Sequence, residues 1–172
     1  MTFINALQRK WRELFPWIRV LVVIGLIALV LDKGEGPPRF EVDGPARLVD
    51  GDSLYVDGLE IRLKNIDAPE GRQKCQRKGR DWMCGQEATR RLRIFIMRRV
   101  ISCKGNEYDL YNRLLAFCSV GGVEINQWMV RQGWAVSFGA YRRAEAAAKR
   151  ARKGIWSSQF ERPRNWRAVH LR

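Results

Sequence analysis

The stretch that decides the fold is Val49–Glu70, which reads VDGDSLYVDGLEIRLKNIDAPE. Two short runs of alternating residues, Ser53–Val56 and Leu59–Leu63, flank the dipeptide Asp57-Gly58. Asp-Gly readily supplies the two consecutive positive-φ residues that a type I′ turn requires. The stretch therefore predicts a tight β-hairpin.

Acidic residues stand at the open end of this hairpin. Asp52 precedes the first strand, and Asp67 and Glu70 follow the second. Antiparallel strands lie about 5 Å apart, so we expect these carboxylates to gather, with Arg62 pointing into the same region. Carboxylates bind Ca²⁺ or Mg²⁺ and act as general bases, and a guanidinium grips phosphate. The set favours phosphodiester chemistry, although Asp57 alone is better interpreted as a turn former.

The composition indicates one globular domain with an appendage and a polyanionic partner. The chain has 172 residues and a net charge of +14. Such a field favours nucleic acid or anionic lipid. The single histidine, His170, lies two residues from the C-terminus. Its isolation argues against mechanisms that use a histidine base or a histidine-bound zinc.

Residues 1–31 are expected to form a signal anchor or transmembrane helix. A basic stretch precedes the apolar run Val20–Leu31. A helix of that length spans only about 18 Å of a roughly 30 Å hydrocarbon core, but extension back through residues 15–18 lengthens it, with Arg19 snorkelling. No A-x-A-like cleavage site follows, so an uncleaved anchor is favoured over a cleavable signal peptide.

The charge distribution around this segment predicts its orientation. The basic residues lie on the N-terminal side of the apolar run, so the following chain is expected to be exported. We therefore expect a protein of the inner (cytoplasmic) membrane whose globular domain is periplasmic or extracellular. The alternative is secretion after signal cleavage.

The rest of the chain divides into a Gly/Pro linker at 32–38, a domain at 39–160 and a basic tail at 161–172. Strands are expected between Arg39 and Asn65, and a loop at Asp67–Met83. Further along, the periodicity predicts helices and strands in turn: a helix at 85–99, strands at 100–104 and 114–120, and helices at 123–131 and 141–153. The expected fold is α+β but mainly β: a five-stranded OB-type Greek-key barrel with about three helices, preceded by the N-terminal hydrophobic helix. Periodicity alone does not separate it from another small α+β arrangement.

Four cysteines, Cys75, Cys84, Cys103 and Cys118, are expected to pair if the domain is exported. The first two close a short loop, and the last two lie in predicted strands that could be neighbours. Pairing of Cys75 with Cys84 and of Cys103 with Cys118 is favoured over the two other pairings. A zinc site is a weak alternative because neither pair has C-x₂-C spacing. Four buried thiols would be expected in a cytosolic protein.

Five motifs together resemble the staphylococcal nuclease-like (thermonuclease) family. The resemblance covers about residues 40–160, and its motifs occur in order at compatible spacings. They are VDGDS at 49–53, IRLKNIDAPE at 61–70, DLYNR at 109–113, INQWMVRQGWA at 125–135 and GIWS at 154–157. The resemblance also implies an OB-type barrel.

The resemblance implies a role for each acid of the hairpin. Asp52 and Asp67 correspond to metal-binding carboxylates, and the carbonyl of Ala68 to a backbone ligand. Such oxygen ligands suit Ca²⁺, with Mg²⁺ possible on ligand type. Glu70 falls at the position of the family's proposed general base, where it would orient or deprotonate the attacking water.

The resemblance also implies which residues hold the substrate. Arg62 and Arg113 match two arginines that clamp the scissile phosphate and stabilise its growing negative charge. Tyr111 matches a residue that contacts phosphate or the nucleotide. A further family tyrosine aligns with Gly139, so Tyr141 and Phe138, which flank that position, are candidates for a stacking face.

The function implied is a Ca²⁺-dependent nuclease of DNA and RNA that cleaves the 5′ P–O bond in line and leaves 3′-phosphate ends. Its expected partners are the nucleic-acid substrate and, through residues 1–31, the membrane; no protein partner is predicted. The main alternative is a non-catalytic OB-fold nucleic-acid-binding module tethered to a membrane. Two further alternatives are a metal nuclease of the D…E-x-K type and a protein that lies on anionic lipid. For the first, this sequence lacks the required lysine.

Overall fold

The computed structural model of the chain describes Ile18, residues 20–24 and residues 38–170. Ile18 and residues 20–24 are helical. The rest of the predicted anchor and most of the predicted linker lie outside the described residues. No helix in the described part of the chain is both long and apolar enough to cross a membrane. The chain divides into two units, Met1–Gly36 and Pro37–Arg172, and the second unit contains the fold described below.

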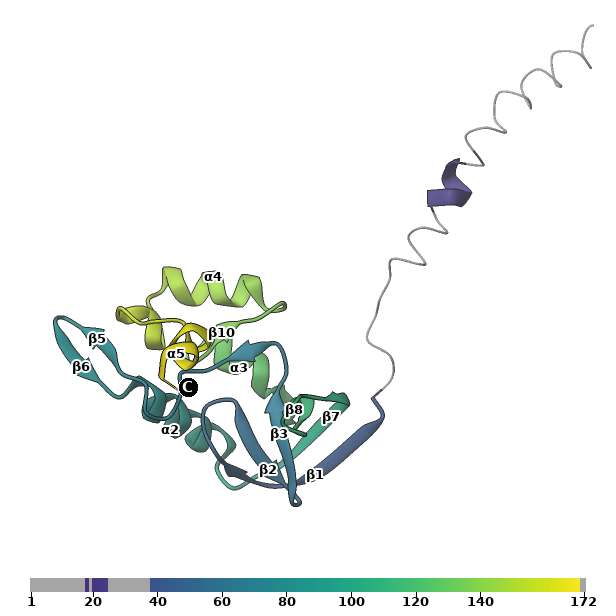
Figure 1. Cartoon of the computed structure of the whole chain (residues 1–172). Coiled ribbons are helices and arrows are strands. Elements are labelled where there is room, and N and C mark those ends of the chain that lie inside the picture. The colour runs from purple at the N-terminus through teal and green to yellow at the C-terminus, as the bar shows by residue number, and fades with distance from the viewer. Residues whose placement is uncertain (1–17, 19, 25–37, 171–172) are drawn as a thin grey trace, which may run out of the picture. The chain divides into compact units, whose positions relative to one another are not determined.

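Five strands close into a barrel, as the sequence predicts (Figure 1). Their order is β3-β2-β1-β7-β8, and a parallel pairing between β3 and β8 closes the ring, while the other neighbours are antiparallel. Closure leaves no open edge between these strands. The architecture fits an OB-like fold. The strands are β1 (Phe40–Leu48), β2 (Ser53–Val56), β3 (Leu59–Leu63), β7 (Val100–Tyr108) and β8 (Leu114–Val120), with the short β9 (Val123–Glu124) paired to β8.

The predicted hairpin is β2–β3, and its turn has the expected geometry. Val56 pairs with Leu59, and the two intervening residues have φ of 47° at Asp57 and 80° at Gly58. This is the left-handed backbone that the Asp-Gly dipeptide tolerates. The turn sets the register in which Ser53 lies opposite Arg62 at the other end of the hairpin.

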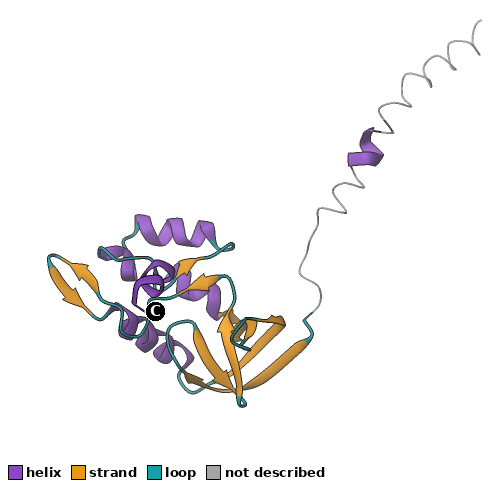
Figure 2. Cartoon of the chain, in the orientation of Figure 1, coloured by secondary structure: helices purple, strands orange, loops and turns teal. Residues whose placement is uncertain are grey.

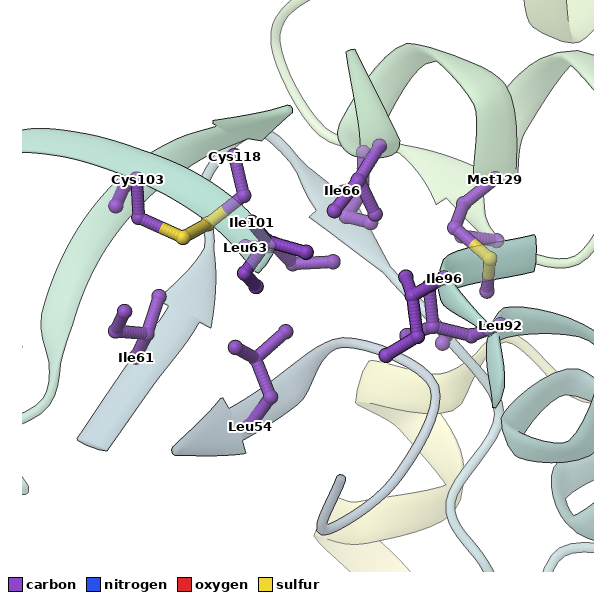
Figure 3. Packing of buried hydrophobic residues seen from close by; sticks show 14 of the residues in the cluster. Leu54, Ile61, Leu63, Ile66, Leu92, Ile96, Ile101, Cys103, Cys118 and Met129 are labelled. Carbon is purple, nitrogen blue, oxygen red and sulfur yellow. A yellow bond between two sulfur atoms is a disulfide. The ribbon is translucent and has the colours of Figure 1, made fainter. Parts of the chain in front are cut away.

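The core fills the barrel and continues to the helices beside it (Figure 3). Leu54, Ile61 and Leu63 of the hairpin are fully buried, as alternation in β2 and β3 predicts. On the helical side, Leu92 and Ile96 of α2 (Cys84–Ile96) belong to the same cluster. The hairpin strands are therefore held rigidly behind the acidic residues at their ends.

Three helices agree with the prediction, and one was not foreseen (Figure 2). The expected helices are α2, α3 (Ile125–Arg131) and α4 (Arg142–Arg150). After the short 3₁₀ helix η1 (Gly154–Ser157), the chain forms α5 (Pro163–His170) within the predicted basic tail. Pro163 is buried and stands at the first helical position, where proline is well tolerated. The domain was predicted from sequence to end at residue 160, whereas the structure has a further helix after that residue.

The predicted loop Asp67–Met83 also contains short strands. β4 (Ile66–Asp67) pairs with β10 (Val136–Ser137), and β5 (Cys75–Arg77) pairs with β6 (Arg80–Trp82). Strands of two or three residues are too short to show periodicity, so the sequence gives no signal for them. The β4–β10 pairing fixes the backbone at Asp67, one of the predicted metal-binding residues.

Both predicted disulfides are present. Cys103 and Cys118 lie directly opposite each other on β7 and β8 and are buried in the core. Cys75 and Cys84 join β5 to the first residue of α2. The second bridge lies in the segment that follows Glu70.

Non-reducing peptide mapping of the purified protein should recover Cys75–Cys84 and Cys103–Cys118. Replacing Cys103 and Cys118 together by alanine should lower the free energy of unfolding by about 2–4 kcal/mol, because the bridge restrains the unfolded chain. Chemical denaturation of this variant beside wild type measures the loss. Four thiols that alkylate freely without reductant would contradict both the pairing and an oxidising location.

Candidate active site

A single guanidinium joins the two most buried acids. Arg62 on β3 donates to Asp52 Oδ1 at 2.7 Å and to Asp67 Oδ1 at 2.9 Å. Asp52 is 2% exposed and Asp67 is 6% exposed. The hairpin places Arg62 and Asp52, and β4 places Asp67. The predicted meeting of these three side chains is present.

Backbone hydrogen bonds hold Asp52 in position. Its Oδ2 accepts from the backbone N–H of Ala68 at 2.7 Å, and its Oδ1 accepts from the Ser53 hydroxyl at 3.1 Å. Asp50 tightens the preceding turn, because its Oδ1 accepts from the backbone N–H groups of Asp52 and Ser53. Asp50 is thus a turn-forming residue that orients Asp52.

Burial is the largest influence on the pKa of Asp52. Desolvation raises the pKa of this carboxyl to about 7, against the positive charge of Arg62, and the carboxylates of Asp50 and Asp67 add to the rise. Burial also acts to lower the pKa of Arg62, but Asp52 and Asp67 outweigh it, so this pKa is raised overall. A further cation beside Asp52 would favour its ionised form.

Glu70 lies in a tightly packed turn after Pro69. The carbonyl of Glu70 accepts from the Gln73 backbone N–H at 2.7 Å, and the Gln73 side-chain oxygen accepts from the Glu70 N–H at 3.2 Å. Gly85 at the start of α2 packs so closely that an added Cβ would lie 1.7 Å from the Glu70 carbonyl oxygen. Gln73 and Gly85 were not foreseen from sequence, because neither belongs to a chemically distinctive motif.

Arg167 of α5 also reaches the acidic cluster. Its Nη1 donates to Asp67 Oδ1 at 2.8 Å and to Glu70 Oε1 at 2.7 Å. Burial acts to lower the pKa of Arg167, but the hydrogen bonds to these carboxylates outweigh it, so the pKa is raised and the group stays charged. The only sequence signal for α5 was a proline at the start of the helix with basic residues after it. The sequence pattern indicated a basic tail in this segment, and the helix was therefore not predicted.

Arg113 is linked to the cluster through a hydroxyl. Its Nη1 lies 3.4 Å from Ser53 Oγ, and that hydroxyl donates to Asp52. Asp109 holds the guanidinium from the other side, with Nε–Oδ2 at 2.8 Å and Nη2–Oδ2 at 2.6 Å. Tyr111 is 79% exposed, with the Arg113 guanidinium 5.2 Å from its ring centre. The DLYNR motif therefore presents an arginine and an open aromatic ring at the edge of the cluster.

The two candidate stacking residues differ in their placement. The Tyr141 hydroxyl donates to Glu124, and its ring packs against the core. Phe138 is 61% exposed and lines a cavity of about 490 Å³ together with Arg62 and Asp67. The structure brings Phe138 to the site, whereas Tyr141 does not line this cavity.

The carboxylate oxygens of the cluster are of the kind that bind a divalent cation, but the cluster offers few of them. Among the described residues, no three histidine, cysteine or acidic side chains are grouped so that they could hold a metal ion. Asp52 and Asp67 nevertheless both contact one guanidinium, so their oxygens lie close together. Hard carboxylate oxygens are what Ca²⁺ and Mg²⁺ prefer. A cation bound to Asp67 Oδ1 would compete with Arg62 and Arg167, which both contact that oxygen.

Several known proteins are similar to this chain in sequence. The chain is 31% identical over 147 residues to the succinoglycan biosynthesis protein ExoI of Rhizobium meliloti, covering 81% of this chain and 75% of that protein. It is 32% identical over 134 residues to the probable endonuclease LCL3 of Verticillium alfalfae, covering 67% of this chain and 46% of that one. An uncharacterized endonuclease of Escherichia coli O157:H7 is 30% identical over 122 residues, covering 64% of this chain and 74% of that protein.

A family profile matches as well. The profile described as "Staphylococcal nuclease homologue" matches residues 60–158, which include Arg62, Asp67, Glu70 and Arg113. This match agrees with the resemblance that the five sequence motifs carry. The chain belongs to the staphylococcal nuclease homologue family.

Proposed function

We propose that this protein is a metal-dependent nuclease that hydrolyses phosphodiester bonds of DNA and RNA. The observation that carries the proposal is one cluster in which the Asp52, Asp67 and Glu70 carboxylates meet the guanidiniums of Arg62 and Arg167. Family membership and relatives named as endonucleases support nuclease activity in general. The metal and the individual catalytic roles are the further content of the proposal.

Arg62 and Arg113 bind the scissile phosphate in this proposal. Hydrolysis accumulates negative charge on the non-bridging oxygens, and fixed guanidiniums stabilise that charge most in the transition state. Both groups are already oriented, Arg62 by Asp52 and Asp67, and Arg113 by Asp109.

Glu70 orients or deprotonates the attacking water. Its backbone is fixed by Gln73 and by the close approach of Gly85, while its carboxylate is partly exposed to solvent. A carboxylate held at a fixed point beside the phosphate directs a water molecule along the line opposite the leaving group. Following the family resemblance, the 5′ P–O bond breaks and a 3′-phosphate remains.

Asp52, Asp67 and the backbone carbonyl of Ala68 would hold Ca²⁺, with Mg²⁺ as the alternative. The cation would supply charge neutralisation at the phosphate and favour ionised carboxylates around it. The closeness of the Asp52 and Asp67 carboxylates, which both contact Arg62, supports this assignment, since hard carboxylate oxygens are the ligands that Ca²⁺ and Mg²⁺ prefer.

We also propose that residues 1–31 hold the protein at the membrane with the nuclease domain on the exported side. Basic residues before the apolar run support this orientation. The two disulfides support an oxidising compartment. Secretion after cleavage of the segment would give the same compartment without the anchor.

A plasmid-nicking assay with the full chain tests the function directly. Activity should require Ca²⁺ or Mg²⁺ and disappear in excess EDTA. Asp67→Asn should lower the rate by roughly 100-fold or more and remove Ca²⁺ binding in calorimetry, because it deletes a ligand charge with little change in volume. Thermal unfolding of the variant controls for loss of the Arg62 ion pair.

Undiminished cleavage in EDTA would exclude the metal. Tight DNA binding without cleavage under any metal would instead favour the non-catalytic OB-fold module.

A matched pair of glycine variants tests the positioning of Glu70. Gly85→Ala should lower kcat by about tenfold or more, because the new Cβ displaces the Glu70 carbonyl. Gly71→Ala is the control, since no atom outside the two adjacent residues lies within 4 Å of a Cβ added at that position. Steady-state kinetics on one oligonucleotide should show a wild-type kcat for Gly71→Ala. Equal kcat values for the two variants would show that the α2 contact does not govern Glu70.

A further inference from the structure

Helix α5 brings two arginines to the catalytic cluster. Arg164 and Arg167 are three residues apart and therefore share one face of the helix. Both line the cavity of about 490 Å³ that Arg62 and Phe138 also line. A cavity of this size is within the range that accommodates part of a small ligand such as a nucleotide.

The two arginines differ in their partners. Arg167 shares the carboxylates of Asp67 and Glu70, and Asp67 is already paired with Arg62. Arg164 is exposed and makes no ion pair within the described part of the chain. The residues that line the cavity carry four positive charges, on Arg62, Lys64, Arg164 and Arg167, against three negative charges, on Asp67, Glu107 and Asp109. The lining is therefore net positive and favours an anionic ligand.

The start of α5 is fixed to the domain independently of Arg167. The Gln73 side chain donates to the Glu161 carbonyl at 2.6 Å, and Pro163 is buried. Gln76 and Gln159 exchange backbone hydrogen bonds of 2.8 Å just upstream. The helix can thus stay in place while the long Arg167 side chain changes partner.

We propose that Arg167 is a substrate-binding residue that rests on Asp67 and Glu70 in the free protein and transfers to a backbone phosphate of the bound nucleic acid, with Arg164 contacting the same strand. This inference rests on the proposed nuclease function. A phosphate replaces the carboxylates as a charge-assisted hydrogen-bond acceptor for the guanidinium. The transfer releases Glu70 to face water, so substrate binding and exposure of the base occur together.

A double-mutant cycle in EDTA isolates this exchange. The affinity of a short single-stranded oligonucleotide is measured by fluorescence anisotropy for the full chain and for Arg167→Ala. The same pair is then measured in an Asp67→Asn/Glu70→Gln background, where Arg167 has lost both charged partners. Arg167→Ala should weaken binding by less than about threefold in the first background and by roughly tenfold or more in the second.

Two further arginine variants complete the comparison. Arg131→Ala removes one exposed charge at the end of α3, and its small loss should be the same in both backgrounds. Arg164 lines the cavity and Arg131 does not, so Arg164→Ala should weaken binding more than Arg131→Ala in both backgrounds. Thermal unfolding and limited proteolysis of α5 establish that each variant is folded.

The outcomes separate this inference from the function on which it rests. Equal losses for Arg167→Ala in the two backgrounds would make Arg167 a structural anchor of α5 and overturn the transfer. An Arg164→Ala loss no greater than that of Arg131→Ala would overturn the placement of the strand on α5. The cycle measures binding without metal, so absence of cleavage would contradict the proposed function and leave the role of Arg167 standing.

Discussion

The ion pairs of Arg62 with Asp52 and Asp67 are the constraint on which the site depends. The nearly buried carboxylates of Asp52, in the turn before β2, and of Asp67, on β4, are held together by one guanidinium from the barrel strand β3. Removing one member of such a buried set typically costs 3–5 kcal/mol, because the remaining charge stays buried without a partner. The fold and the proposed chemistry therefore depend on the same residues, and a variant such as Asp52→Asn should perturb both. Glu70, at the margin of the cluster and partly exposed, is the acid that can be altered with least damage to the core.

A second set of contacts ties distant parts of the chain to Glu70. Gln73 is fully buried and bonds both to the Glu70 turn and to the Glu161 carbonyl before α5. The Cys75–Cys84 bridge closes the same segment onto the start of α2. The disulfide, the helix and the C-terminal segment thus converge on one turn of the backbone. Their common effect is to fix the backbone of Glu70, while Arg167 contacts its carboxylate.

Local chemistry explains which features could be predicted from the sequence. The Asp57-Gly58 turn, the alternating strands beside it and the grouping of Asp52, Arg62 and Asp67 follow from turn geometry and register, and the structure has all of them. Helix α5 and the contact of Arg167 with Asp67 could not be predicted, because they depend on how the end of the chain packs about one hundred residues away from β4. The stacking assignment of Tyr141 followed chain position, whereas its contact with Glu124 depends on how α4 packs. Short strands such as β4 and β10 gain stability only from tertiary pairing, so they lacked a periodic signal.

The most direct measurement is single-turnover cleavage of one labelled oligonucleotide by wild type and Glu70→Gln, with affinity measured in parallel. Gln keeps the size of Glu70 but cannot accept a proton, so the comparison isolates the charge and basicity of the side chain. The account predicts that the cleavage rate falls by roughly 100-fold or more while the affinity does not fall. A cleavage rate within about twofold of wild type would contradict the account, because the acidic cluster would then not be the centre that hydrolyses the phosphodiester.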